Sequence, residues 1–166
     1  MAMDITIRAA TERDVPLVLH LIRGLAEYER MADQVTATEA GLRESLFGPS
    51  PSAEVVIADA LSEPVGFALF FHNYSTFVGK RGLYLEDLFV KPEWRGRGVG
   101  RQLLVHLAGL AVARNCGRLE WAVLDWNEPA IRFYRGLGAR PMHDWTVFRV
   151  DGDELQQLAA ERAETR

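Results

Sequence analysis

The residues with the clearest chemical potential form one short segment, Arg95-Gly-Arg-Gly-Val-Gly-Arg101. Its glycines, at 96, 98 and 100, leave the backbone uncovered, so that consecutive N–H groups could converge on an anion. The arginines of the segment add positive charge, and a helix that begins here would add the positive end of its dipole. We therefore expect a phosphate-bearing ligand, most simply a pyrophosphate. The alternative is a glycine-rich surface turn without a ligand.

Two well-known phosphate-binding loops do not match this segment. It lacks the Gly-Lys-Ser/Thr ending of a P-loop, and Arg101 stands where a dinucleotide-binding loop has its third glycine. The dinucleotide-binding loop also follows the first strand of its unit, whereas this segment follows the fourth predicted strand.

The elements that must position this segment follow from hydrophobic periodicity and capping residues. We expect helices that begin at the capping boxes Thr11–Asp14 and Thr36–Glu39, the second ending near Gly48-Pro49. We expect further helices from the glycines to about Arg114 and from Asn127 to Gly136 or Gly138, and either a terminal helix or a frayed tail over 151–162. The predicted strands are 4–9, 54–60, 65–73, 83–90 and 118–124, with one or two more in 139–150. This order predicts an α/β (α+β) fold in a single domain, residues 1–166.

Composition excludes several classes of protein. The chain has 166 residues, is 48% hydrophobic, carries a formal charge of −4 and contains one cysteine. An acidic chain is a poor nucleic-acid binder, and we expect no nucleic-acid partner. The apolar runs are too short for a membrane span, the start lacks a signal-peptide layout, and a lone thiol suits a reducing compartment. We therefore expect a cytoplasmic protein without a membrane partner, and the scattered histidines predict no metal site.

Arg95-x-x-Gly98-x-Gly100 after an apolar strand resembles the acetyl-CoA motif of the GNAT N-acetyltransferase superfamily. The predicted order of elements is similar to that family's over nearly the whole chain. More narrowly, the segments Leu25–Glu29, Leu83–Val90, Ala122–Asn127 and Phe133-Tyr134 resemble the diamine (spermidine/spermine) acetyltransferases and their thialysine-acetylating relatives. The resemblance implies a GNAT-like fold with a mixed, mostly antiparallel central sheet of about seven strands, splayed at the acetyl-CoA site, and helices on both faces. It also implies a homodimer.

The resemblance further implies which residues bind acetyl-CoA. The backbone of Leu88, Phe89 and Val90 would pair with the pantetheine arm, and Asn127 would contact CoA. Tyr134, also a CoA contact, would be the general acid, since a phenol of pKa about 10 can protonate a thiolate whose free pKa is about 8.5. Asn127 and Tyr134 lie seven residues apart and would share one helix face. A packed tyrosine is the alternative for Tyr134. The residues implied for the pyrophosphate are Arg95, Gly96, Arg97, Gly98, Val99, Gly100 and Arg101.

Acidic residues are the candidates for the amine substrate. Glu86 and Asp87 are adjacent on one strand, so we expect them on opposite faces. The resemblance assigns Glu86 to the amine, which it would orient and help to deprotonate, because an alkylamine is almost fully protonated at pH 7. Asp87 is then expected to be structural. Tyr28 and Glu29 would belong to the amine pocket, and surface solvation explains Glu29 equally well.

One departure narrows the expected substrate. Polyamine-specific members carry an extra acidic residue where this chain has Tyr74-Ser-Thr-Phe77, so the chain looks more like the thialysine type. We therefore predict direct transfer of an acetyl group from acetyl-CoA to a primary amine of a small molecule: a thialysine-like amino acid, a diamine or a polyamine. A catalytically inactive CoA-binding or interaction module is the alternative from another class. A protein N-terminal or lysine acetyltransferase is the second alternative.

Overall fold

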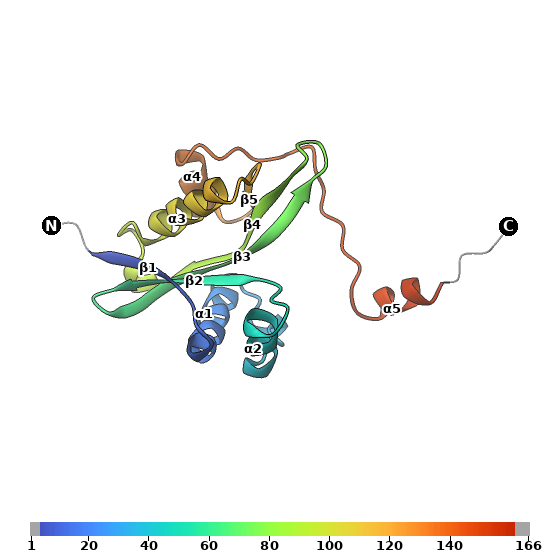
Figure 1. Cartoon of the computed structure of the whole chain (residues 1–166), viewed down its shortest axis with the longest axis horizontal. Coiled ribbons are helices and arrows are strands. Elements are labelled where there is room, and N and C mark those ends of the chain that lie inside the picture. The colour runs from blue at the N-terminus through green and yellow to red at the C-terminus, as the bar shows by residue number, and fades with distance from the viewer. Residues whose placement is uncertain (1–3, 162–166) are drawn as a thin grey trace. The chain divides into compact units, whose positions relative to one another are not determined.

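The computed structural model describes residues 4–161. The chain divides into two compact units, one up to Leu124 and one from Asp125, and each is described by itself. The single domain over 1–166 therefore stays a prediction. The elements, in chain order, are β1 (Ile5–Ala9), α1 (Val15–Tyr28), α2 (Glu39–Phe47), β2 (Glu54–Ala60), β3 (Glu63–Ser75), β4 (Lys80–Val90), α3 (Val99–Ala113), β5 (Leu119–Trp121), α4 (Glu128–Gly136) and α5 (Gly152–Ala160) (Figure 1).

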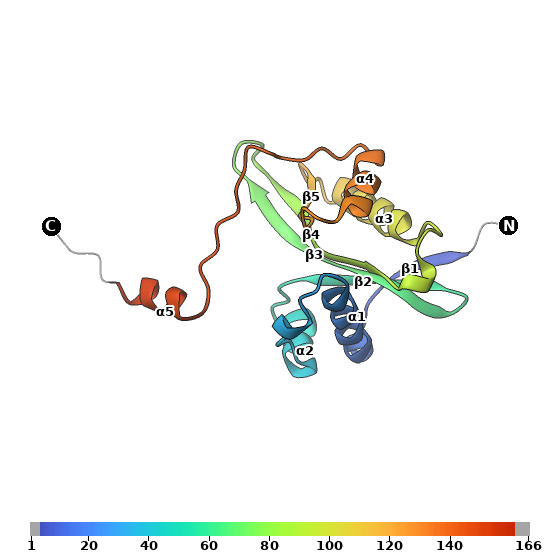
Figure 2. The same cartoon turned by 180° about the vertical axis from the view of Figure 1, so that it is seen from behind.

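The first unit is built on one mixed sheet with the strand order β1-β2-β3-β4-β5. The first three pairings are antiparallel, and β4 pairs with β5 in parallel. Helices α1 and α2 cover one face of the sheet and α3 covers the other (Figures 1 and 2). The predicted mixed, mostly antiparallel sheet with helices on both faces is thus confirmed.

The prediction of about seven strands is wrong for the part of the chain that the structure describes, where the sheet has five. The expected closing strands in 139–150 do not form, and this stretch is irregular, with a turn at His143 and Asp144 and no ladder pairing. Its β-favouring side chains are exposed, among them Val147 at 84% and Phe148 at 92%. Strand propensity reflects packing against neighbouring strands more than a backbone preference, so composition alone does not make a strand here.

The core that supports β4 lies between the sheet and the helices α1 and α2. Gly24 allows a close approach, because a Cβ at this position would lie 3.0 Å from the Phe89 ring of β4. Burial of such side chains removes apolar surface from water and fixes α1 against the sheet. The buried residues of this core are Val18, Leu21, Leu25, Leu46, Val55, Ile57, Phe67 and Phe89.

Short polar contacts set the helix starts. The capping box predicted at Thr11 is present, with the Thr11 N–H donating to the Asp14 carboxylate at 2.7 Å, and it precedes α1. The second prediction, a cap at Thr36, is wrong by two residues. The Gly41 N–H donates to the Thr38 hydroxyl at 3.1 Å, so Thr38 caps α2. Thr36 and Thr38 are equally suitable as capping residues, and the local backbone conformation decides which of them caps α2.

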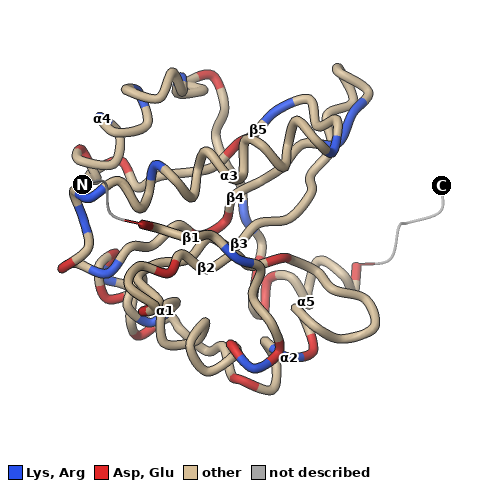
Figure 3. Tube along the Cα trace, turned by 60° about the vertical axis from the view of Figure 1, so that its left-hand side comes forward, with Lys and Arg blue, Asp and Glu red and all other residues tan. Residues whose placement is uncertain are grey.

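Charges of both signs are interspersed along the trace (Figure 3). Among residues 4–161, no helix combines the length and apolar character needed to cross a membrane.

Candidate active site

The second half of β4 has an open edge. Its pairing with β5 covers only Leu83–Leu85, opposite Leu119–Trp121, whereas β4 itself continues to Val90. On the other side, Leu88 to Val90 remain paired with β3, and the Lys91 N–H donates to the Val65 carbonyl at 2.9 Å. In an antiparallel ladder, successive residues direct their backbone groups to alternate sides. Phe89 therefore faces β3, while Leu88 and Val90 turn their N–H and C=O groups toward the open edge.

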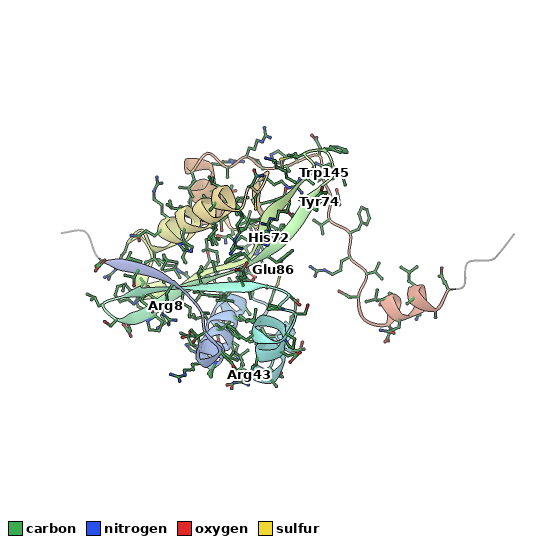
Figure 4. All side chains as sticks on the ribbon, in the orientation of Figure 1. Arg8, Arg43, His72, Tyr74, Glu86 and Trp145 are labelled. Atoms are coloured by element: carbon green, nitrogen blue, oxygen red, sulfur yellow. The ribbon has the colours of Figure 1, made fainter. Side chains whose placement is uncertain are left out.

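A β-bulge in β4 places Glu86. Asp87 is opposite Leu69 and Leu85 is opposite Phe70, so Glu86 is the extra residue between two pairs. Such a bulge redirects the side chains around it. Glu86 is exposed and lies in the central part of the sheet, away from the hairpin tip that carries Tyr74 (Figure 4).

The bulge changes the face to which Asp87 belongs. Phe70 lies on the α3 face, where the Arg114 guanidinium stands 5.9 Å from its ring. Leu69 packs into the core of the α1 and α2 face, so its partner Asp87 shares that face. Leu85 and Asp87, two residues apart, thus lie on opposite faces. The bulge thus assigns Asp87 to the face of α1 and α2, and the expected separation of Glu86 from Asp87 stays a prediction.

The Asp87 carboxyl group is partly buried and lies within the electrostatic influence of two other carboxylates. Burial, followed by the charges of Glu86 and Glu29, raises the pKa of Asp87 to about 6. Burial also raises the pKa of Glu29, which follows the last turn of α1. Among residues 4–161, no cluster of His, Cys, Asp and Glu is arranged to hold a metal ion. A partly buried carboxyl group with a pKa of about 6, such as that of Asp87, is suited to exchange protons near neutral pH.

Arg95 connects the glycine-rich segment to the end of α1. Its Nε donates to the Val90 carbonyl at 2.9 Å, which is one of the groups that face the open edge. Its guanidinium lies over the Tyr28 ring at 4.4 Å and over the Phe89 ring at 5.6 Å. The structure thus brings Tyr28, Arg95 and the end of β4 together. Arg97 points elsewhere, with its guanidinium 5.2 Å from the Trp94 ring.

The glycine-rich segment leads directly into α3. Gly96 and Gly98 have φ values of 72° and 87°, which favour glycine, and a Cβ at either position would meet nothing within 4 Å. The first bond of the α3 ladder runs from the Gln102 N–H to the Gly98 carbonyl at 3.0 Å. The N–H groups of residues 99–101 precede this ladder and point along the helix start. Open space, backbone donors and a helix dipole together suit an anion.

Gly98→Ala is expected to destabilise the protein by about 1 kcal/mol, because an alanine in the left-handed region strains the backbone. Urea unfolding measures the change. The matched control is Gly109→Ala in the same helix, where a Cβ also has open space but φ is ordinary. That variant should gain roughly 0.5 to 1 kcal/mol from helix propensity. Equal effects of the two substitutions would contradict the assigned role of Gly98.

Asn127 and Tyr134 belong to the second unit. Asn127 is buried and caps α4, its side-chain oxygen accepting from the Ala130 N–H at 3.4 Å. This confirms the predicted helix start. Tyr134 lies in the last turns of α4, with its ring 5.4 Å from that of Phe133. The roles of both residues toward CoA stay predictions.

An open strand edge beside a glycine-rich helix start is an arrangement that suits an extended ligand with a phosphate group at one end. The profile of the family described as Acetyltransferase (GNAT) family matches residues 21–139. The chain belongs to this family and is an acetyl-CoA-dependent N-acetyltransferase.

Similarities to individual proteins are consistent with this family assignment. A thialysine N-epsilon-acetyltransferase from Bos taurus is 41% identical over 166 residues, covering 93% of this chain and 97% of its own length. An L-ornithine N5-acetyltransferase from Arabidopsis thaliana is 34% identical, with 92% and 86% covered. Among solved structures, an integron cassette protein from the mobile metagenome of V. cholerae has a TM-score of 0.81 at 28% identity, with 96% and 99% covered.

The sequence reasoning missed Asp87 as a candidate for the site. The adjacent Glu86-Asp87 pair was visible, but a regular strand would have turned one of the two away. A bulge depends on the pairing with β3, for which the β4 sequence carries no local sign. An acidic pair at the centre of an apolar strand was the signal that could have found it, since Asp and Glu are seldom buried unless they are paired.

Proposed function

We propose that this protein transfers the acetyl group of acetyl-CoA directly to a primary amine of a small molecule, with a thialysine-like amino acid as the preferred class. The observation that carries the proposal is the arrangement around the second half of β4. An open strand edge, a glycine-rich helix start and a group of carboxylates all meet there. These are the three features that an acyl donor with a phosphate-bearing tail and a cationic acceptor require.

The residues present fit acetyl-CoA. Leu88 and Val90 direct backbone groups to the open edge, where an extended arm could pair as a further strand would. Because the Val90 carbonyl already accepts from Arg95, the Leu88 groups and the Val90 N–H are the available partners. The backbone donors of Gly96 to Arg101 would hold the pyrophosphate, and Asn127 would contact CoA as in the resembling family. When bound, the thioester supplies an activated acetyl group.

The carboxylates on the bulge, Glu86 and Asp87, would prepare the amine. They attract the ammonium group and take one proton from it, which passes to solvent. The nitrogen then forms its bond to the acetyl carbon while the carbon–sulfur bond breaks. Tyr134 gives its proton to the leaving thiolate and regains one from the nitrogen, so that the step balances. Tyr134 is supported by its match to the family motif and by the acidity of a phenol.

Two observations support the substrate class: the activities for which the relatives are named, and the distribution of acidic residues in this chain. The relatives above are named for acetylation of thialysine and of ornithine, amino acids with one side-chain amine. The acids near the end of β4 include Glu29, whereas the hairpin segment 74–77 carries none, which leaves little to hold the far end of a polycation. Tyr28 and Glu29, at the end of α1, are the proposed contacts for the remainder of the amino acid.

Steady-state kinetics with acetyl-CoA and a panel of amines tests the proposal. The panel contains thialysine, lysine, ornithine, putrescine, spermidine and a peptide with a free N-terminus. We expect the highest kcat/KM for an amino acid with a side-chain amine. A peptide acetylated more efficiently than every small amine would favour a protein acetyltransferase instead. CoA binding without turnover of any amine would favour the inactive module.

We also infer a homodimer and a cytoplasmic location for the protein. The homodimer is supported by the family resemblance and by large apolar side chains that are exposed in the second unit, such as Trp145 at 73%. The location is supported by the single cysteine. Sedimentation velocity distinguishes a dimer from a monomer.

A further inference from the structure

Arg95 makes contacts that a phosphate ligand alone does not require. It belongs to the segment predicted to hold the pyrophosphate, yet its guanidinium lies 4.4 Å from the Tyr28 ring centre, on the amine side of the site. The same side chain donates from Nε to the Val90 carbonyl at 2.9 Å. One residue therefore touches the open strand edge and the end of α1 at once.

These contacts restrict both of their partners. The bond from Nε occupies the Val90 carbonyl and so limits which backbone groups the open edge offers to a ligand. The guanidinium also packs over the Tyr28 ring, which is 36% exposed, and so covers part of this aromatic surface at the end of α1. An arginine suits both tasks, because its planar guanidinium stacks on a ring while its N–H groups still donate in the plane.

We propose that Arg95 is a positioning residue for the amine subsite, which couples that subsite to the acetyl-CoA edge by holding Tyr28 and the Val90 carbonyl together. This inference rests on the proposed function, because it takes Tyr28 as part of the amine pocket. It predicts that a residue of the phosphate segment governs the KM for the amine. Arg97 makes no such contact with α1 and lies over Trp94 instead, so it should affect acetyl-CoA alone.

A comparison of Arg95→Gln with Arg97→Gln tests the difference. Arg95→Gln should raise the KM for the preferred amine by about 3- to 10-fold, the range expected for loss of one cation–π contact, while kcat changes little. Arg97→Gln should raise the KM for acetyl-CoA and leave that for the amine within about twofold. Calorimetric titration with CoA and thermal unfolding of the free variants show whether the fold and the CoA site persist.

A double-mutant cycle with Tyr28 isolates the contact. Tyr28→Leu should raise the KM for the amine as Arg95→Gln does, and the double variant should be no worse than the poorer single variant. Tyr28→Phe keeps the ring, so Arg95→Gln should raise the amine KM in this background by the same factor as in the parent protein. The inference would be overturned if the two single effects on the amine KM multiplied in the double variant. It would also be overturned if Arg95→Gln left the amine KM unchanged. Either result counts only against this inference as long as the parent protein acetylates the amine. A parent protein that binds CoA but acetylates no amine would overturn the proposed function, and this inference with it.

Discussion

Tyr134→Phe is expected to lower kcat by roughly 10²- to 10³-fold, the loss typical of a missing general acid. The substitution removes one hydroxyl and keeps the ring that packs beside Phe133. Without the phenol, the thiolate must leave unprotonated or take its proton from water. The KM values for acetyl-CoA and for the amine should change little, because the hydroxyl acts in the step rather than in binding. Rates measured at saturating concentrations of both substrates give the answer.

Two control measurements show whether the Tyr134→Phe variant still folds and still binds CoA. The dissociation constant for CoA and the midpoint of thermal unfolding should both match those of the parent protein. A pH profile of kcat should also lose its dependence on a protonated phenol at high pH. An unchanged kcat at the pH optimum would remove Tyr134 from the mechanism and support the alternative that it is a packed tyrosine.

Asp87→Asn is expected to make the protein more stable and less active at the same time. The pKa of Asp87 is raised to about 6 from an ordinary value of 3.8, mainly by burial. A raised carboxyl pKa means that stability is complete below about pH 4 and is lost as the pH rises through 6. Asparagine stays neutral, so the variant should gain about 2 kcal/mol above pH 7 and nothing near pH 4. Urea unfolding across this pH range measures the gain.

The activity of the Asp87→Asn variant tests whether Asp87 takes part in the reaction. If Asp87 helps to accept the ammonium proton, kcat/KM for the amine should fall at least tenfold at pH 7, even though the protein is more stable. The control is Asp33→Asn, because Asp33 is exposed and its replacement should change neither quantity. A variant with full activity would show that Asp87 is structural, as the sequence led us to expect. A variant without the stability gain would contradict the burial of its charge.

Much of the fold was predictable because it depends on local patterns. Runs of strand-favouring residues located β2, β3 and β4, and the glycines of the phosphate segment marked the start of α3. The polar start at Asn127 likewise located α4. These signals act within a few residues of the chain, so they are present in the sequence itself.

The features that escaped prediction depend on partners distant in the sequence. The bulge at Glu86 depends on the pairing of β4 with β3, in which Asp87 lies opposite Leu69 on the face that α1 and α2 cover. Arg95 was expected to serve a phosphate, and only the end of α1 shows its second contact, with Tyr28. Segment 139–150 has the composition of a strand but no pairing in the structure. Local propensity could not reveal any of the three, since each is decided by tertiary contacts.

A single-turnover experiment tests the central claim, direct acetyl transfer to a small primary amine, most directly. The protein is loaded with acetyl-CoA labelled in the acetyl group, mixed with thialysine and quenched at short times, and the label is located by mass spectrometry. The account predicts acetylated thialysine, with one CoA released for each acetyl group transferred and no labelled protein on the way. Label accumulating on the protein, or acetyl-CoA that stays bound and intact with every amine of the panel, would contradict it.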